Sequence, residues 1–249
     1  MRVVSLCPSL TETVFRLGKG ESLVGRTKFC VQPADRVSAV ERVGGTKNPR
    51  LERIFALAPD LVLMNEEENR REDADALTAR GLTVCSTFAR DVPGAIAQVR
   101  ELGTLLGAVA AAETLAASIE ARAKTIAADV ASQPRVRFVY LIWREPLMAV
   151  APGTYVDGLL TLAGGENVVG ASSGRYPTVD GEQLARADQI LLSSEPFPFE
   201  QKHLDELAAE SGLPAARFRL VDGELLSWHG ARTLEGLAYA HQILHRPVL

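Results

Sequence analysis

Residues 44–65 read GGTKNPRLERIFALAPDLVLMN. A loop comes first, then a helix with Asn48 as its predicted cap and Pro49 at its first position, and then a buried strand at 61–64. A shorter version of the same order, EQLARADQILL, returns at residues 182–192. Because the same helix–strand unit occurs in both halves, we expect two similar lobes with a ligand cleft between them.

The composition excludes several classes of protein. Of the 249 residues, 47% are hydrophobic and 23% are charged, which is enough apolar material for a substantial core. A formal net charge of −4 argues against nucleic acid as a partner, because phosphate contacts need a basic face. No apolar run is long enough to predict a membrane span. The three cysteines suit small buried side chains better than a disulfide framework or a metal site.

The first part of the chain alternates short strands with helices, which predicts parallel pairing in an α/β lobe. The expected elements are a strand at 3–6, a helix at 10–17 that opens with a capping box of Ser9 and Glu12, a charged helix at 68–80 and a strand at 82–85. A longer helix is expected at 108–133, where neither glycine nor proline occurs. At 1.5 Å per residue it would be about 37 Å long, which suits a stiff spacer between lobes.

The second part of the chain repeats the alternation. We expect strands at 136–142, 189–192 and 218–221, and helices at 155–162 with Thr154 as cap, 182–186, 203–210 and 231–245. The fold class is therefore α/β, with two Rossmann-like lobes at 1–106 and 134–249 joined by the single long helix at 107–133.

Candidate ligand-binding side chains stand where the predicted strands end. In open α/β sheets, ligands collect at the carboxyl ends of the strands, and aromatic rings there can cover a flat apolar ligand. The residues in such positions are Phe29, Asn65, Phe88, Trp143, Tyr176 and Trp228. A core or loop-anchoring role remains the alternative for each aromatic residue.

His229 lies in a Ser-Trp-His-Gly turn before the last helix, where it could contact a ligand or be tied to backbone carbonyls. His241 and His245 are four residues apart but have no third ligand nearby, so we expect surface histidines and no metal site. The sequence contains no phosphate-binding glycine loop and no nucleophile elbow. It therefore predicts no catalytic residue.

Several motifs together resemble the helical-backbone (class III) substrate-binding proteins of ABC importers, and within them the vitamin B12-binding branch. The motifs are RVVSLCPSLTE at 2–12, LERIFALAPDLV at 51–62, GGEN at 164–167 and YPTVDGEQL at 176–184. The resemblance implies two α/β lobes that hold a metal chelate between them with little hinge closure and no built-in cofactor. It places Asn65 and Tyr176 where the relatives carry pocket tryptophans, and Phe29, Phe88 and Trp143 in pocket-lining segments.

The resemblance also implies a permease partner. Family members bind it through one surface glutamate per lobe. Glu182 matches the position in the second lobe, whereas Arg71 occupies the position in the first lobe and Glu72 beside it is the candidate replacement.

The expected ligand is a corrinoid such as cobalamin, with haem or a ferric siderophore as alternatives. The other alternative is a cytoplasmic small-molecule enzyme that uses His229 with Glu145 or Glu195. The family is periplasmic or surface-anchored, but the chain enters a strand directly and shows no signal peptide. We therefore expect a cytoplasmic protein if this start is complete, and a monomer.

Overall fold

The computed structural model describes residues 1–170 and 174–245. The chain divides into two compact units. Unit 1 comprises Met1–Ala89, Pro93–Ser118 and His229–Arg232, and unit 2 comprises Arg90–Val92, Ile119–Trp228 and the chain from Thr233 onward. Each unit contains a sheet with parallel strands and flanking helices, so the predicted α/β class is confirmed.

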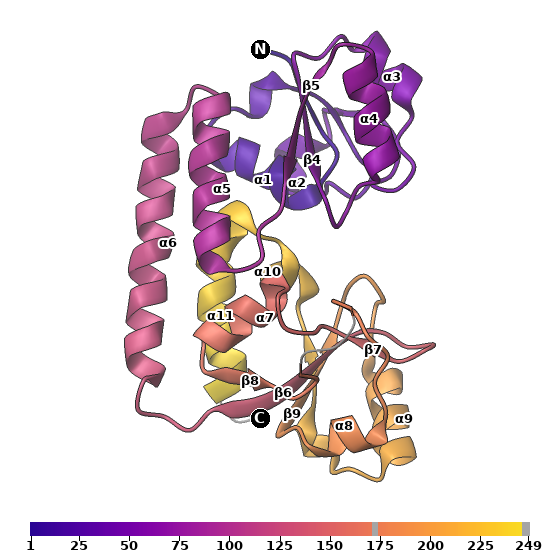
Figure 1. Ribbon diagram of the computed structural model, residues 1–249, viewed down its shortest axis with the longest axis vertical. Coiled ribbons are helices and arrows are strands. Elements are labelled where there is room, and N and C mark those ends of the chain that lie inside the picture. Colours follow the sequence, from indigo (N-terminus) through magenta and orange to yellow (C-terminus); the bar gives the residue numbers. More distant parts are fainter. Residues whose placement is uncertain (171–173, 246–249) are drawn as a thin grey trace. The chain divides into compact units, whose positions relative to one another are not determined.

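Unit 1 is built on a five-stranded parallel sheet in the order β3-β2-β1-β4-β5 (Figure 1). Its strands are β1 (Val3–Ser5), β2 (Leu23–Arg26), β3 (Glu41–Arg42), β4 (Leu61–Asn65) and β5 (Thr83–Thr87). The central strands β1 and β4 are buried along their whole length. Their near-continuous apolar sequences suit this position, because a parallel sheet is covered on both faces. Ile54, Leu77 and Met64 belong to the core beside this sheet.

The helices of unit 1 lie between these strands in the sequence or follow the last of them. They are α1 (Pro8–Arg16), η1 (Gly20–Ser22), α2 (Ala34–Val37), α3 (Leu51–Ala56), α4 (Arg71–Ala79), α5 (Val92–Leu105) and the late segment η3 (Gly230–Arg232). The sequence missed β2, β3, α2 and α5. Strand β3 has only two residues, both exposed, and so carries no apolar pattern.

Two predicted helix caps were wrong. Helix α1 begins at Pro8 with Cys7 as cap, so Ser9 lies inside the helix and there is no capping box at Ser9 and Glu12. Helix α3 begins after Arg50, which makes no side-chain capping bond. Asn48 instead belongs to a tight turn in which its carbonyl accepts the N–H of Gly45 at 3.3 Å. Proline at the first position starts α1 earlier than predicted, and the turn at Gly45–Asn48 takes Asn48 out of the cap position of α3.

Helix α6 (Val109–Val130) is the predicted long helix, and the division between the units falls within it. Its first turns pack against α5, where Arg100 donates two hydrogen bonds of 2.8 Å to Glu113. A side chain at Gly103 of α5 would approach the Cβ of Ala112 to 2.2 Å, so glycine permits the close contact of these two helices.

Unit 2 contains the second sheet, in the order β10-β9-β6-β7 with β8 also paired to β6. Its strands are β6 (Val136–Trp143), β7 (Met148–Ala149), β8 (Gly165–Asn167), β9 (Gln189–Ser193) and β10 (Phe218–Val221), all parallel to their neighbours except for the β6–β7 pair. The central strands β6 and β9 contribute Val139, Leu141, Ile190 and Leu192 to the core.

The helices of unit 2 are α7 (Tyr155–Leu162), α8 (Gly181–Ala185), α9 (Gln201–Ser211), η2 (Ala215–Arg217), α10 (Gly223–Ser227) and α11 (Thr233–His245). They include the four that the sequence predicts, whereas α10 and η2 were not predicted. Figure 1 shows α7, α10 and α11 on one side of the sheet and α8 and α9 on the other. Thr154 caps α7 as predicted, accepting the N–H of Asp157 at 3.3 Å. The repeated helix–strand unit is present as α3–β4 and α8–β9.

Substitution of Gly236 by alanine should destabilise unit 2. A Cβ at this position of α11 would come within 2.3 Å of the carbonyl oxygen of Leu225 in α10. Backbone has to move to relieve this overlap, so we expect the free energy of unfolding to fall by about 2 kcal/mol. Urea denaturation measures the change. Gly181→Ala is the matched control, because a Cβ there meets no atom within 4 Å; equal losses in the two variants would contradict the prediction.

Within the described residues, no helix is both long enough and apolar enough to cross a membrane.

Candidate functional site

A buried polar cluster lies at the carboxyl ends of β4 and β5 in unit 1. Asn65, the last residue of β4, is 2% exposed, and His229 is 6% exposed. Asn65 Nδ2 lies 3.1 Å from His229 Nε2, and the side-chain amide nitrogen of Gln98 lies 2.9 Å from His229 Nδ1. Ser9 Oγ is 3.5 Å from both ring nitrogens. The structure thus brings together two residues, Asn65 and His229, that the sequence singled out separately.

The hydrogen bonds of Asn65 define the proton position on His229. Asn65 Nδ2 donates to the carbonyl of Thr87 at 3.0 Å, and Asn65 Oδ1 accepts the N–H groups of Glu67 and Glu68 at 3.0 and 3.2 Å. Since an amide nitrogen can only donate, His229 Nε2 must accept and the ring proton must lie on Nδ1. The amide of Gln98 satisfies Nδ1–H when it presents its oxygen there, which a half-turn of the amide allows.

Burial also sets the charge of His229. The surroundings disfavour the imidazolium and lower the pKa of His229 from 6.5 to about 4. The side chain is therefore neutral at pH 7, with Nε2 occupied by Asn65. This geometry suits a histidine that holds its loop in place, and ligand contact by His229 stays a prediction.

Two further contacts hold the segment His229–Arg232 within unit 1. The guanidinium of Arg232 donates to both carboxylate oxygens of Glu12, at 2.7 and 3.0 Å. The N–H of Ala231 donates to Thr13 Oγ1 at 3.0 Å. The Arg232 and Glu12 side chains are only 14% and 10% exposed, so water screens this pair weakly.

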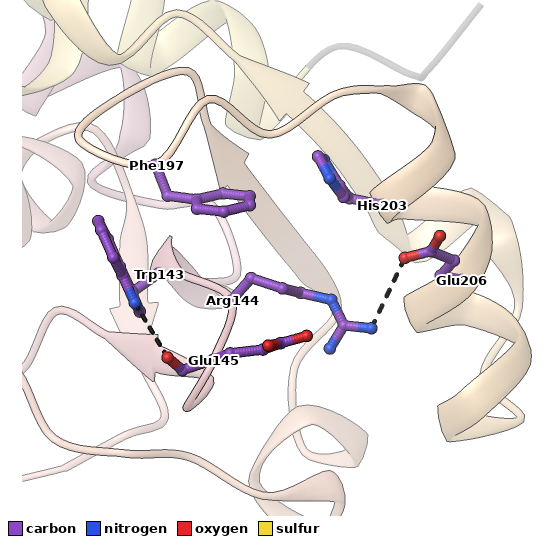
Figure 2. Close-up of a pocket in the computed structure, with 6 residues that line it drawn as sticks. All are labelled: Trp143, Arg144, Glu145, Phe197, His203 and Glu206. Atoms are coloured by element: carbon purple, nitrogen blue, oxygen red, sulfur yellow. Dashed lines mark hydrogen bonds and ion pairs between the residues drawn. The ribbon is translucent and has the colours of Figure 1, made fainter.

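Unit 2 contains an aromatic pocket at the carboxyl ends of β6 and β9 (Figure 2). The pocket is a cavity of about 450 Å³, a size within the range of small-molecule sites. Figure 2 shows the Phe197 ring between Trp143 and His203. Trp143 meets Phe197 edge to face with ring centroids 5.7 Å apart, and Phe197 meets His203 in the same way at 5.1 Å. The remaining lining residues are Arg144, Glu145 and Glu206.

Hydrogen bonds and ion pairs with neighbouring residues hold the polar side chains of this pocket in place. Arg144 Nη2 lies 2.7 Å from a carboxylate oxygen of Glu210 and 3.7 Å from one of Glu206. His203 Nδ1 accepts the N–H of Glu200 at 3.0 Å, so the proton of the neutral ring is on Nε2. Trp143 donates its indole N–H to the carbonyl of Glu145 at 3.1 Å. The pocket therefore combines aromatic surface with a histidine N–H donor.

Trp228 is buried, with 6% of its surface exposed. Its indole N–H donates to Glu195 Oε1 at 2.8 Å, and Ser227 Oγ donates to the same oxygen at 2.7 Å. Glu195, which the enzyme alternative paired with His229, thus anchors the end of α10.

The other predicted ligand residues are more accessible. Phe29, Trp143 and Tyr176 are 49%, 41% and 37% exposed, and Phe88 is half-buried. Of the aromatic candidates, only Trp143 lines the pocket in unit 2. Among the cysteines, Cys7 and Cys30 are buried as predicted, and Cys85 is half-buried. No group of three or more potential metal ligands occurs within residues 1–170 and 174–245.

Comparison with known proteins identifies the family. Residues 3–218 match the periplasmic binding protein family. The chain belongs to that family. As a periplasmic binding protein it is a binding protein and not an enzyme, so the alternative of catalysis by His229 was wrong.

The curated relatives of this periplasmic binding protein include vitamin B12-binding proteins. That of Vibrio campbellii is 25% identical over 194 residues, which cover 78% of this chain and 70% of the relative. The vitamin B12-binding protein of Yersinia pestis is 28% identical over 195 residues, which cover 78% of this chain and 69% of the relative.

Solved structures resemble the whole chain. The periplasmic vitamin B12 binding protein of Vibrio cholerae has a TM-score of 0.84 at 21% identity and covers 98% of this chain and 96% of its own. A periplasmic haem binding protein from Pseudomonas aeruginosa has a TM-score of 0.82 at 25% identity, with coverage of 100% and 95%. These similarities confirm the family expected from the sequence.

The sequence did not single out Phe197, His203, Arg144 or Gln98 in this periplasmic binding protein. Phe197 follows β9 in the run EPFPFE, so the carboxyl end of that strand was an available signal. Gln98 and His203 lie on helices, where nothing in the local pattern distinguishes them from surface residues.

Proposed function

We propose that the protein is the substrate-binding component of an ABC importer and that it binds a metal chelate, in the first place a corrinoid such as cobalamin. The observation that carries this proposal is the aromatic pocket of unit 2, where Trp143 and Phe197 offer flat apolar surface beside polar groups. Such surface suits the planar macrocycle of a chelate. The names of the B12-binding and haem-binding relatives support the same class of ligand.

The chelate would be cargo and not a resident cofactor. Haem is the second candidate, because a haem binding protein covers this chain fully. The interlobe cleft and the ligand roles of Phe29, Asn65, Phe88, Tyr176, Trp228 and His229 stay predictions. For permease docking we propose Glu182 and Glu72, which are exposed in the first turns of α8 and α4.

Titration with chelates tests the function directly. Cobalamin, haemin and a ferric siderophore should each be added to the purified protein while the visible absorbance is recorded. We expect at least one to bind with saturation and to raise the melting temperature by mass action. Failure of all three to bind would contradict the proposal.

Trp143→Ala should weaken binding of that chelate. Removal of the indole takes away aromatic contact surface worth about 1–3 kcal/mol, which corresponds to about 5- to 150-fold in the dissociation constant. Leu220→Ala is the control, since Leu220 is 38% exposed on β10 and does not line the pocket. Equal affinity of the wild type and the Trp143 variant would remove this residue from the site.

A further inference from the structure

A second cavity, in unit 1, is lined by positive charge. Its volume is about 350 Å³, and its lining residues are Lys28, Arg42, Gly44, Gly45, Asn48, Arg50 and Arg53. No acidic residue belongs to this lining. The protein as a whole has a net charge of −4. The positive charge of this cavity is therefore opposite in sign to the net charge of the chain.

Only one of these cations has a carboxylate partner in the described part of the chain. Arg53 Nε lies 3.0 Å from Glu41 Oε1. Lys28 Nζ lies over the Phe29 ring, 4.8 Å from its centroid, and within residues 1–170 and 174–245 no carboxylate pairs with Arg42 or Arg50. Like charges held close together repel, and an anion between them would remove that repulsion.

A buried arginine beside the cavity adds to the positive field. Arg26 is 3% exposed and donates to the carbonyl oxygens of Val37, Thr27 and Cys30 at 2.8, 3.2 and 3.0 Å. It lies opposite Arg42 in the β2–β3 pair. Burial, followed by the charge of Arg42, lowers the pKa of Arg26. The field at Arg42 is therefore reinforced from inside the unit.

Gly44 and Gly45 line part of the cavity, and because they have no side chains the backbone forms its surface there. Gly44 has a φ of +119°, which side chains rarely adopt, and a Cβ on Gly45 would lie 2.3 Å from Asn48 Oδ1. The Asn48 amide thus lies directly against the Gly45 backbone. Larger residues at 44 and 45 would disturb this turn and fill space beside the basic side chains.

We propose that this cavity binds the carboxylate or phosphate groups of an anionic ligand. Arginine guanidinium groups suit these anions because their N–H donors match the geometry of paired oxygens. The anion could be a small free molecule or a chelate that carries negative groups. The second source rests on the proposed function and narrows its ligand class to chelates that carry negative groups.

The test compares two variants with equal loss of charge. Arg42→Gln/Arg50→Gln removes two cavity cations that have no carboxylate partner among the described residues, and Arg122→Gln/Lys124→Gln removes two exposed cations of α6 as the control. Calorimetry at low ionic strength measures binding of citrate and inorganic phosphate. Absorbance titration compares haemin with its dimethyl ester, and cobalamin with dicyanocobinamide, which lacks the phosphodiester.

The binding results distinguish the two sources of the anion. For a free anion, citrate or phosphate binds the wild type and the control alike, and the Arg42/Arg50 variant binds about tenfold more weakly. For a chelate with negative groups, the wild type prefers the charged member of a chelate pair and the Arg42/Arg50 variant loses that preference.

If no chelate binds but citrate binding requires Arg42 and Arg50, the chelate function fails while the anion site stands. If binding of every probe is the same in the Arg42/Arg50 variant and in the control, the anion site is refuted.

Discussion

Arg232→Met is expected to lower the free energy of unfolding by about 3 kcal/mol or more, because it leaves the Glu12 carboxylate nearly buried without its partner. Glu12 receives two hydrogen bonds from Arg232, at 2.7 and 3.0 Å, and its side chain is 10% exposed. The double variant Glu12→Leu/Arg232→Met should regain much of the loss, since no buried charge then remains. Chemical denaturation of the three proteins measures these differences.

The chain offers a matched control for this pair. Arg100 and Glu113 form the same two-bond arrangement at 2.8 Å, but their side chains are 39% and 57% exposed. Water and salt screen this exposed pair, so Arg100→Met should cost far less than Arg232→Met. Similar losses in the two variants would show that burial does not determine the contribution of Arg232.

Acidification from pH 7 to pH 4.5 should cost the folded protein about 2 kcal/mol through His229 alone. Burial lowers the pKa of His229 from 6.5 to about 4. Between these values the unfolded chain binds the proton and the folded chain does not. This stability is therefore fully present above about pH 6.5 and is lost as the pH falls towards 4.

The variant His229→Gln isolates this effect from the carboxylates that also titrate at low pH. Glutamine cannot gain the proton, so the difference in unfolding free energy between wild type and variant should shrink from pH 7 to pH 4.5. The measurement is urea denaturation at several pH values across this range. A difference that is independent of pH would mean that His229 is protonated equally easily in the folded and unfolded chains.

Much of the fold could be predicted from local patterns. The aliphatic runs of β4, β6 and β9, the Thr154 cap and the glycine- and proline-free stretch of α6 each express their structure within a few residues. Short exposed elements such as β3 could not be found, because two polar residues have no periodicity. Helix starts were displaced where a proline or a turn competed with the predicted cap, as at Cys7 and Arg50.

The candidate sites were predicted less completely. The rule that ligands gather at strand ends selected Trp143 and Asn65, and the structure places both at the last positions of their strands. It did not select His203 or Gln98, because the sequences of their helices do not indicate that His203 contacts Phe197 or that Gln98 contacts His229. Arg42 and Arg50 were also missed, since a cavity forms only when the turn at 44–49 brings them together with Lys28 and Arg53.

The order of residues was sufficient to specify the α/β class, the repeated helix–strand unit and the central strands, because hydrophobic periodicity and chain stiffness act over short distances. Tertiary structure assigned the side chains their partners. Glu12 fits a helix cap when only its neighbours are considered, yet its carboxylate binds Arg232, 220 residues later. His229 likewise acquires its neutral state from burial that no local pattern records, and its hydrogen-bond partner Asn65 lies 164 residues earlier.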